Sequence, residues 1–174
     1  MVIYFTNDKK MNESVDSRRL DATDLRLLHL LQDDASLSNQ ALAERAHVSP
    51  ATCLRRVARL SANGVIERRV ALLSPERVGA GLTAIVEITL DRQGAEHLAA
   101  FEARVKADEA VMQCYQVSPG PDFVLVVQVH DMAGYQALVQ RLFTQDANVR
   151  NVKSFFSVKR AKFETRIALP DRAG

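Results

Sequence analysis

Hydrophobic residues in the first part of the chain recur with a helical period in three short stretches. Leucines on this period predict a first helix from about Asp21 to Gln32. Ser38 and Ser49 are good N-caps for two further helices, and Gly64 is a good residue to end the last one. A short helix, a tight turn and a second capped helix have the spacing of a helix-turn-helix motif.

The third predicted helix has two chemically different sides. A helical projection places Leu54, Val57 and Leu60 on one side, which we expect to face the first two helices. The opposite side would then be exposed, and its polar residues suit the bases and phosphates of a DNA major groove. The predicted DNA contacts of this helix and its N-cap are Ser49, Thr52, Arg55, Arg56, Arg59 and Asn63.

The segment that follows this helix has the composition of strands. Residues 65–73 are rich in hydrophobic and β-branched side chains and have the right length for a two-stranded wing. Arg68 and Arg69 would then contact phosphates beside the helix-turn-helix. The alternative is that these two arginines only solvate the wing.

A different pattern begins after residues 74–81, which contain one proline and two glycines and are expected to form a linker. Alternation of hydrophobic and polar residues predicts a half-buried strand over 82–90. The later predicted elements are a helix over 95–107, strands over 111–118 and 123–130, a helix near 135–143 and a strand over 149–159. This βαββαβ order is the ferredoxin-like arrangement, so the predicted fold class is α+β.

A sheet of this order has one face covered by its two helices and one open face. The open face would also carry apolar side chains, for instance Cys114 or Val126, depending on the register. An uncovered apolar sheet face usually meets a partner. We therefore expect this face to pair two subunits.

The composition is that of a folded, soluble, cytoplasmic protein. The chain has 174 residues, of which 47% are hydrophobic and 25% charged. It lacks an apolar run of membrane-spanning or signal-peptide length, and its two cysteines favour a reducing compartment. No metal-ligand spacing, phosphate-binding loop or nucleophile motif occurs, so we expect no metal, no cofactor, no catalytic residue and no membrane partner.

The net charge of +2 is unevenly distributed along the chain. Residues 16–75 carry nine basic and seven acidic residues, whereas residues 76–174 carry twelve of each. Within the first region, residues 52–70 hold five arginines against one glutamate. Arginine suits phosphates and guanine edges. Together with the helix-turn-helix spacing, this clustering favours double-stranded DNA as a partner over a merely solvated basic face.

Several motifs are similar to those of the Lrp/AsnC family of transcription regulators, over roughly residues 18–166. In the N-terminal region, the resemblance rests on Leu20-Asp21-x-x-Asp24-x-x-Leu27-Leu28 and on the run from Val48 to Ile66. In the C-terminal region, it rests on Val86–Leu90, on Val117-Ser118 with Asp122-Phe123, and on Asp131-Met132-x-x-Tyr135.

The resemblance implies a DNA-binding regulator that is modulated by an amino acid or related metabolite bound between C-terminal domains. It also implies homodimers that assemble further, into an octamer. By position, the effector contacts would be Ser118, Gly120, Asp122, Met132 and Tyr135. The sequence departs from the family at Pro119, which, like Pro121, offers no backbone N–H to a ligand carboxylate.

The expected division is a disordered tail (1–17), a winged helix-turn-helix domain (18–73), a linker (74–81), an effector-binding and oligomerisation domain (82–166) and a tail (167–174). Met11 is an alternative start of translation. One alternative function is a tetrapyrrole (sirohaem-type) decarboxylase on the same architecture, although His97 and His130 lie far apart in sequence. Another is an effector-binding module whose DNA contact is vestigial.

Overall fold

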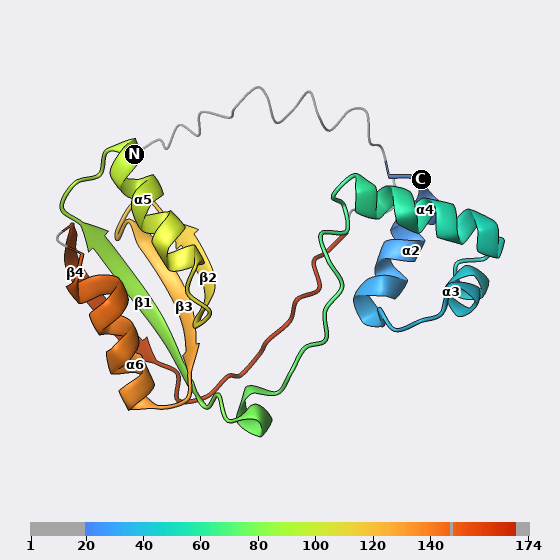
Figure 1. The fold of residues 1–174 in the computed structure, drawn as a ribbon. Coiled ribbons are helices and arrows are strands. Elements are labelled where there is room, and N and C mark those ends of the chain that lie inside the picture. The colour runs from blue at the N-terminus through green and yellow to red at the C-terminus, as the bar shows by residue number, and fades with distance from the viewer. Residues whose placement is uncertain (1–19, 147, 170–174) are drawn as a thin grey trace. The chain divides into compact units, whose positions relative to one another are not determined.

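The computed structural model describes residues 20–146 and 148–169, and its elements are shown in Figure 1. The chain divides into two compact units. In the described part, the first unit comprises residues 20–71 and 164–169, and the second comprises the chain between them. The expected tail 1–17 and the alternative start at Met11 lie outside the described residues.

The first unit contains the three predicted helices, α2 (Ala22–Asp33), α3 (Asn39–Arg45) and α4 (Pro50–Ala62). The two predicted N-caps Ser38 and Ser49 are confirmed, and Asp21 caps α2, because each cap side chain accepts a hydrogen bond from a backbone N–H in the first turn of its helix. The residue after the C-cap of α4 is Gly64, whose φ of +71° lies in the left-handed region that favours glycine.

The core of the first unit lies where the three helices meet. Its buried residues come from all three helices and the turn between α3 and α4: Leu27, Leu42, Ala43, Ala46 and Cys53. Cys53 is fully buried, and this burial raises the pKa of its thiol, with the nearby charge of Arg69 acting in the opposite direction. Cys53 is therefore a packed core residue of the first unit.

The predicted wing is wrong for this chain. Residues 65–73 form no strand in the structure, and most of their side chains are exposed, including Val70, Leu72 and Leu73. β-branched composition favours an extended backbone, but a strand also needs a hydrogen-bonded partner. The described part of the chain supplies none here, so Arg68 and Arg69 lie on an extended segment instead of a hairpin.

The second unit is a four-stranded antiparallel sheet with helices on one face. The linker forms a short 3₁₀ turn, η2 (Pro75–Val78), ahead of the sheet. The elements that follow are β1 (Leu82–Leu90), α5 (Ala95–Lys106), β2 (Val111–Gln116), β3 (Phe123–Val129), α6 (Met132–Val139), a π-helical turn η3 (Gln140–Thr144) and β4 (Val149–Phe156). The strand order β2-β3-β1-β4 confirms the ferredoxin-like prediction.

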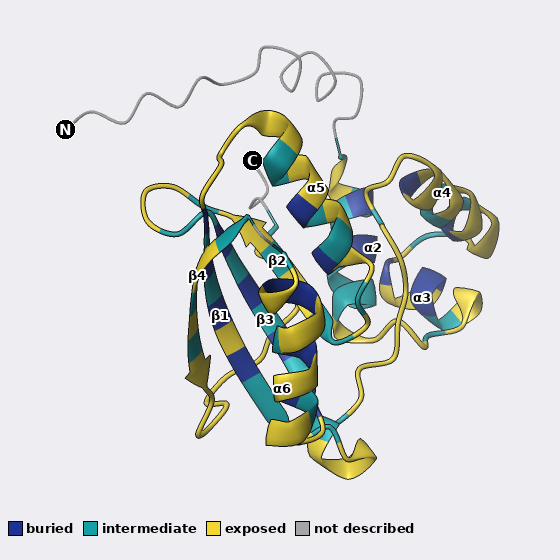
Figure 2. Cartoon of the chain, turned by 60° about the vertical axis from the view of Figure 1, so that its left-hand side comes forward, coloured by how far each residue is buried: buried dark blue, intermediate teal, exposed yellow. Residues whose placement is uncertain are grey.

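The two faces of the sheet differ in burial, as Figure 2 shows along β1 and β3. The covered face carries the core, from Ala84, Val86, Ile88 and Leu90 on β1 to Phe123, Leu125, Val127 and Val129 on β3. The register also settles which of the two candidate residues lies on the open face. Val126 is paired with Ile85 there, whereas Cys114 is paired with Leu125 and packs against the core.

The end of the chain belongs to the first unit. The Gln32 side chain of α2 donates to the carbonyl of Ile167 and accepts from its N–H, at 3.2 and 2.8 Å. Arg166 forms an ion pair with Asp33 and a 3.2 Å hydrogen bond to His29 Nδ1. Residues 164–169 therefore return to α2 in the structure.

Candidate nucleic-acid interface

Helix α4 is rotated relative to the predicted projection. Its inward stripe consists of Cys53, Val57 and Leu60, with the partly covered Arg56 beside them. Leu54 is 62% exposed, so its predicted inward position is wrong. The projection placed Leu54 inward and Arg56 outward, whereas positions 53, 56, 57 and 60 form one continuous helical stripe.

Two arginines of α4 point back to the start of α2. Arg56 Nη1 lies 2.9 Å from Asp24 Oδ1 and 2.5 Å from Asp21 Oδ2, and Arg59 Nη2 lies 2.6 Å from Asp24 Oδ2. The Asp24 side chain is 1% exposed, whereas Asp21 is 51% exposed. One buried carboxylate therefore binds two guanidinium groups of the candidate recognition helix.

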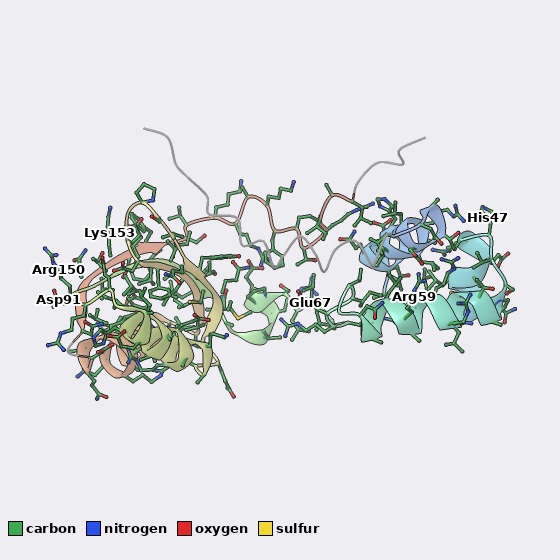
Figure 3. All side chains as sticks on the ribbon, turned by 90° about the horizontal axis from the view of Figure 1, so that it is seen from above. His47, Arg59, Glu67, Asp91, Arg150 and Lys153 are labelled. Carbon is green, nitrogen blue, oxygen red and sulfur yellow. The ribbon has the colours of Figure 1, made fainter. Side chains whose placement is uncertain are left out.

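This cluster changes the prediction for Arg56 and Arg59. The Arg56 side chain is only 20% exposed, so it does not lie on an open polar face as expected. Hydrogen bonds to Asp21 and then Asp24 raise the pKa of Arg56. Arg59 is 45% exposed but is also paired, and Figure 3 labels it on α4. Burial and pairing of this kind need the α2–α4 crossing, which no helical projection of α4 alone contains.

The exposed stripe of α4 is centred on Arg55. Ala51, Leu54 and Ala58 lie beside it, at helical spacing, and all four are exposed. Within the described part of the chain, Arg55 has no hydrogen bond or ion pair. The small side chains at 51 and 58 leave room for a close approach of the helix backbone to a groove.

The remaining predicted DNA contacts lie around this stripe. The Ser49 hydroxyl donates to Thr52 Oγ1 at 2.9 Å while capping the helix, so the two side chains form one local unit at its N-terminus. Asn63 is exposed at the other end of α4. Arg68 and Arg69 are exposed on the extended segment beyond it.

The five predicted effector residues are divided between the two ends of β3. Ser118, Gly120 and Asp122 precede this strand, whereas Met132 and Tyr135 follow it. Seven residues of strand span about 20 Å. The structure therefore does not bring the five residues together around one small ligand within a single chain.

The loop before β3 is anchored by Asp122. Its N–H donates to the carbonyl of Ile88 at 2.8 Å, and its Oδ2 accepts from the N–H of Leu90 at 2.7 Å. Gly120 has a φ of +129°, and a Cβ there would meet no atom within 4 Å. Ser118 and Gly120 are both exposed. The loop thus presents a polar side chain and open backbone on a fixed base.

Beyond β3, the two predicted residues have different surroundings. Met132 is 47% exposed at the start of α6. Tyr135 is 6% exposed, and its hydroxyl is hydrogen-bonded to Ser154 Oγ on β4. Met132 is therefore accessible to a ligand, whereas Tyr135 is buried and its hydroxyl is bonded to another residue of the same unit. Asp131, the residue before Met132, caps α6 by accepting from the Gly134 N–H at 2.8 Å.

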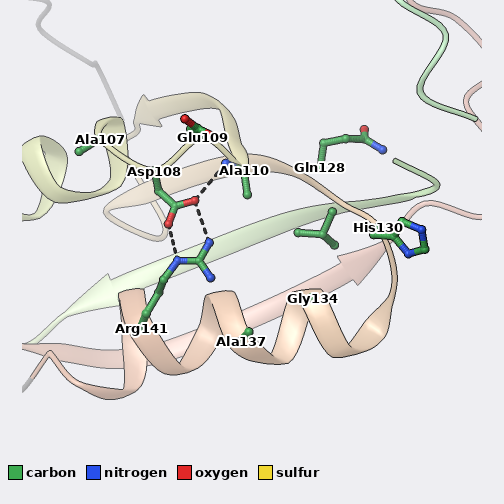
Figure 4. A pocket seen from close by; sticks show the side chains of 10 residues that line it. Ala107, Asp108, Glu109, Ala110, Gln128, His130, Gly134, Ala137 and Arg141 are labelled. Carbon is green, nitrogen blue, oxygen red and sulfur yellow. Dashed lines mark hydrogen bonds and ion pairs between the residues drawn. The ribbon is translucent and has the colours of Figure 1, made fainter. Parts of the chain in front are cut away.

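A hollow of about 610 Å³ lies on the helical side of the second unit (Figure 4). Asp108 and Arg141 form a bidentate ion pair along its wall, with His130 at the far side. None of the five predicted effector residues lines it. Asp108 and Arg141 satisfy each other there, so neither of them needs an ionic ligand.

The described residues contain no cluster of three or more His, Cys, Asp or Glu side chains that could hold a metal ion. None of the helices in the described ranges is both long enough and apolar enough to cross a membrane.

A helix-turn-helix unit whose third helix exposes Arg55, followed by a ferredoxin-like unit, is typical of a two-domain DNA-binding regulator. Two family models match the chain: the AsnC-type helix-turn-helix domain over residues 20–61 and the Lrp/AsnC ligand binding domain over residues 83–167. An HTH-type transcriptional regulator of Haemophilus influenzae is 35% identical over 169 residues, which cover 97% of this chain and 100% of the relative. The leucine-responsive regulatory protein of Salmonella typhimurium is 33% identical, over 91% of this chain and 99% of its own.

Solved structures agree with these relatives. An AsnC family transcriptional regulator from Agrobacterium tumefaciens has a TM-score of 0.79 and 33% identity, covering 85% of this chain and 96% of its own. A transcriptional regulator from Neisseria meningitidis, solved as a complex with L-Met, has a TM-score of 0.79 and 32% identity, covering 86% and 96%. This chain belongs to the Lrp/AsnC family of transcriptional regulators. It is a regulator and not an enzyme, and nothing supports the decarboxylase alternative.

Proposed function

We propose that this regulator inserts α4 into the major groove of double-stranded DNA, with Arg55 as the principal base or phosphate contact. The observation that carries this proposal is that Arg55 is exposed and unpaired among the described residues, between small neighbours at helical spacing. Ser49, Thr52 and Asn63 flank the contact at the two ends of the helix. Arg68 and Arg69 add phosphate contacts from the extended segment.

The test measures DNA affinity against salt concentration for Arg55→Ala. The natural probe is the DNA upstream of the gene that encodes this chain. Loss of one contact with a phosphate should weaken binding and reduce the slope of log affinity against log salt by about 0.9 per bound subunit. Arg92→Ala is the matched control, because Arg92 is exposed in the second unit and carries the same charge. Equal affinities and equal slopes for both variants and the unaltered protein would refute the role of Arg55.

We also propose that an amino acid binds at a junction between copies of this chain. The loop of residues 118–122 would come from one copy and the start of α6, with Met132, from another. The division of these residues between the two ends of β3 supports this arrangement. The L-Met complex of the Neisseria relative supports the class of ligand.

Subunit mixing tests this composite site. Ser118→Arg and Met132→Arg should each abolish the thermal stabilisation that amino acids, L-Met included, give to the unaltered protein. When the two variants are unfolded, mixed and refolded together, some junctions contain two intact halves, so part of the stabilisation returns. If the mixture stays as unresponsive as each variant alone, both halves come from the same chain and the junction model fails.

The open face of the sheet is the surface through which we expect copies of the chain to pair. We infer that the open sheet face pairs two copies and that the dimers assemble further, up to the expected octamer. Ile85, Val126 and Phe155 lie next to one another in register on that face and support an apolar contact. The relatives are bacterial regulators, which supports a cytoplasmic site of action, where bacterial DNA lies.

A further inference from the structure

The buried carboxylate of Asp24 occupies an unusual position for a DNA-binding unit. Among the described residues, it is the one charged side chain that is fully buried. Its two oxygens bind Arg56 and Arg59, and Oδ2 also accepts from the N–H of Asp21 at 3.2 Å. Each carboxylate oxygen of Asp24 is therefore bonded to an arginine of the candidate recognition helix.

This arrangement removes positive charge from the proposed DNA surface. Asp21 and Asp24 balance Arg56 and Arg59, so the four charges sum to zero. Non-specific DNA binding comes almost entirely from phosphate neutralisation by free cations. Because Arg56 and Arg59 are paired, Arg55 is the arginine of α4 that has no hydrogen bond or ion pair among the described residues.

We propose that Asp24 is a specificity-determining residue, which withholds Arg56 and Arg59 from DNA phosphates so that α4 binds chiefly through its exposed stripe. This inference rests on the proposed DNA-binding role of α4. A specific site must compete with a large excess of other DNA, so lowering the affinity for unrelated DNA more than the affinity for the specific site raises the ratio of the two. Arg59, which is 45% exposed, is the arginine that would reach a phosphate first once released.

A purely structural role for the cluster makes the opposite prediction. If Asp24 only fastened α2 to α4, its loss would loosen the helix and weaken binding to every DNA. If Asp24 withholds the arginines, its loss weakens discrimination while strengthening binding to unrelated DNA. The two roles therefore predict opposite changes in the affinity for unrelated DNA when Asp24 is replaced.

The experiment compares Asp24→Asn with the unaltered protein on two duplexes of equal length, one selected from a random pool by the unaltered protein and one of unrelated sequence. For Asp24→Asn, we expect several-fold tighter binding to the unrelated duplex and a salt slope steeper by about 1–2 per bound subunit. The ratio of selected to unrelated affinity should fall about tenfold. Asp21→Asn is the matched control: it makes the same charge change, but Arg56 keeps its bond to Asp24.

A double-mutant cycle tests whether Arg59 causes the gain in affinity of Asp24→Asn for the unrelated duplex. Arg59→Gln alone should leave binding to the unrelated duplex unchanged, because Arg59 is withheld, but it should remove most of the gain when added to Asp24→Asn. Weaker binding of Asp24→Asn to both duplexes, or the same gain in Asp21→Asn, would overturn the proposal. If Asp24→Asn does not fold, Arg59→Gln alone still tests the proposal. A salt slope reduced as much as in Arg55→Gln would mean that Arg59 already contacts a phosphate, and it would overturn the proposal. Failure of the unaltered protein to bind any duplex would instead refute the proposed function.

Discussion

His47 holds the turn between α3 and α4 in a conformation that most residues avoid. Its φ of +56° lies in the left-handed region, where a side chain crowds the following carbonyl. We predict that His47→Val lowers the free energy of unfolding by about 1–2 kcal/mol, because a β-branched residue tolerates this conformation poorly. His47→Asn should be close to neutral, because asparagine adopts it readily. Urea unfolding of both variants tests the prediction, and similar stabilities would contradict it.

Single residues were predicted well where a local rule applies and poorly where a tertiary contact decides. The predicted caps Ser38 and Ser49 follow from backbone hydrogen bonding within one turn, and both are confirmed. The pairing of Arg56 depends on how α2 crosses α4, which the sequence does not show directly. A signal was nonetheless present, because Asp24 lies on the same helical stripe as the buried Leu27 and Leu28.

At the scale of elements, one ion pair connects η3 to the loop that follows α5. Arg141 in η3 binds Asp108, in the loop after α5, through Nε and Nη2, at 2.5 and 2.9 Å. The hydrogen bond from Arg141 is the main cause that lowers the pKa of Asp108 below its usual value of 3.8. The stabilisation is therefore complete above about pH 4 and is lost as the pH falls through the lowered folded-state pKa.

We predict that Arg141→Gln lowers the free energy of unfolding of the second unit at pH 7 by about 0.5–1 kcal/mol, as for a partly exposed ion pair. The difference from the unaltered protein should shrink towards zero at an acid pH below the lowered folded-state pKa of Asp108, where Asp108 is protonated in both folded and unfolded states. Lys106→Gln is the control, because it removes an equal charge from an exposed pair with Glu102. A loss that is equally large at both pH values would show that packing, not the ion pair, is responsible.

Whole elements were predicted where period and alternation agree. The strand over Leu82–Leu90 has the predicted bounds, because five alternating apolar residues can be buried on only one face. Helix α6 begins at Met132, earlier than expected, since Asp131 caps it without any hydrophobic signal. The wing failed for a different reason: extended composition in 65–73 does not supply a pairing strand.

At the scale of the whole molecule, the open sheet face should decide the oligomeric state. Ile85 is 43% exposed and is flanked in register by Val126 and Phe155, and the exposed pair of Glu87 and Lys153 lies beside them. A glutamate at position 85 would carry its charge into the apolar contact between two copies. Burying an unpaired charge costs several kcal/mol, so we predict that Ile85→Glu weakens dimerisation at least about 100-fold.

Light scattering across a dilution series tests this, with Ala99→Glu as the control on the exposed side of α5. The unaltered protein and Ala99→Glu should remain assembled at concentrations at which Ile85→Glu is monomeric. Because DNA binding by several subunits at fixed spacing depends on assembly, Ile85→Glu should also lose affinity for DNA while keeping the fold of its helix-turn-helix unit. If Ile85→Glu assembles like the control, the copies pair through another surface, and the apolar row on this sheet face has a different partner.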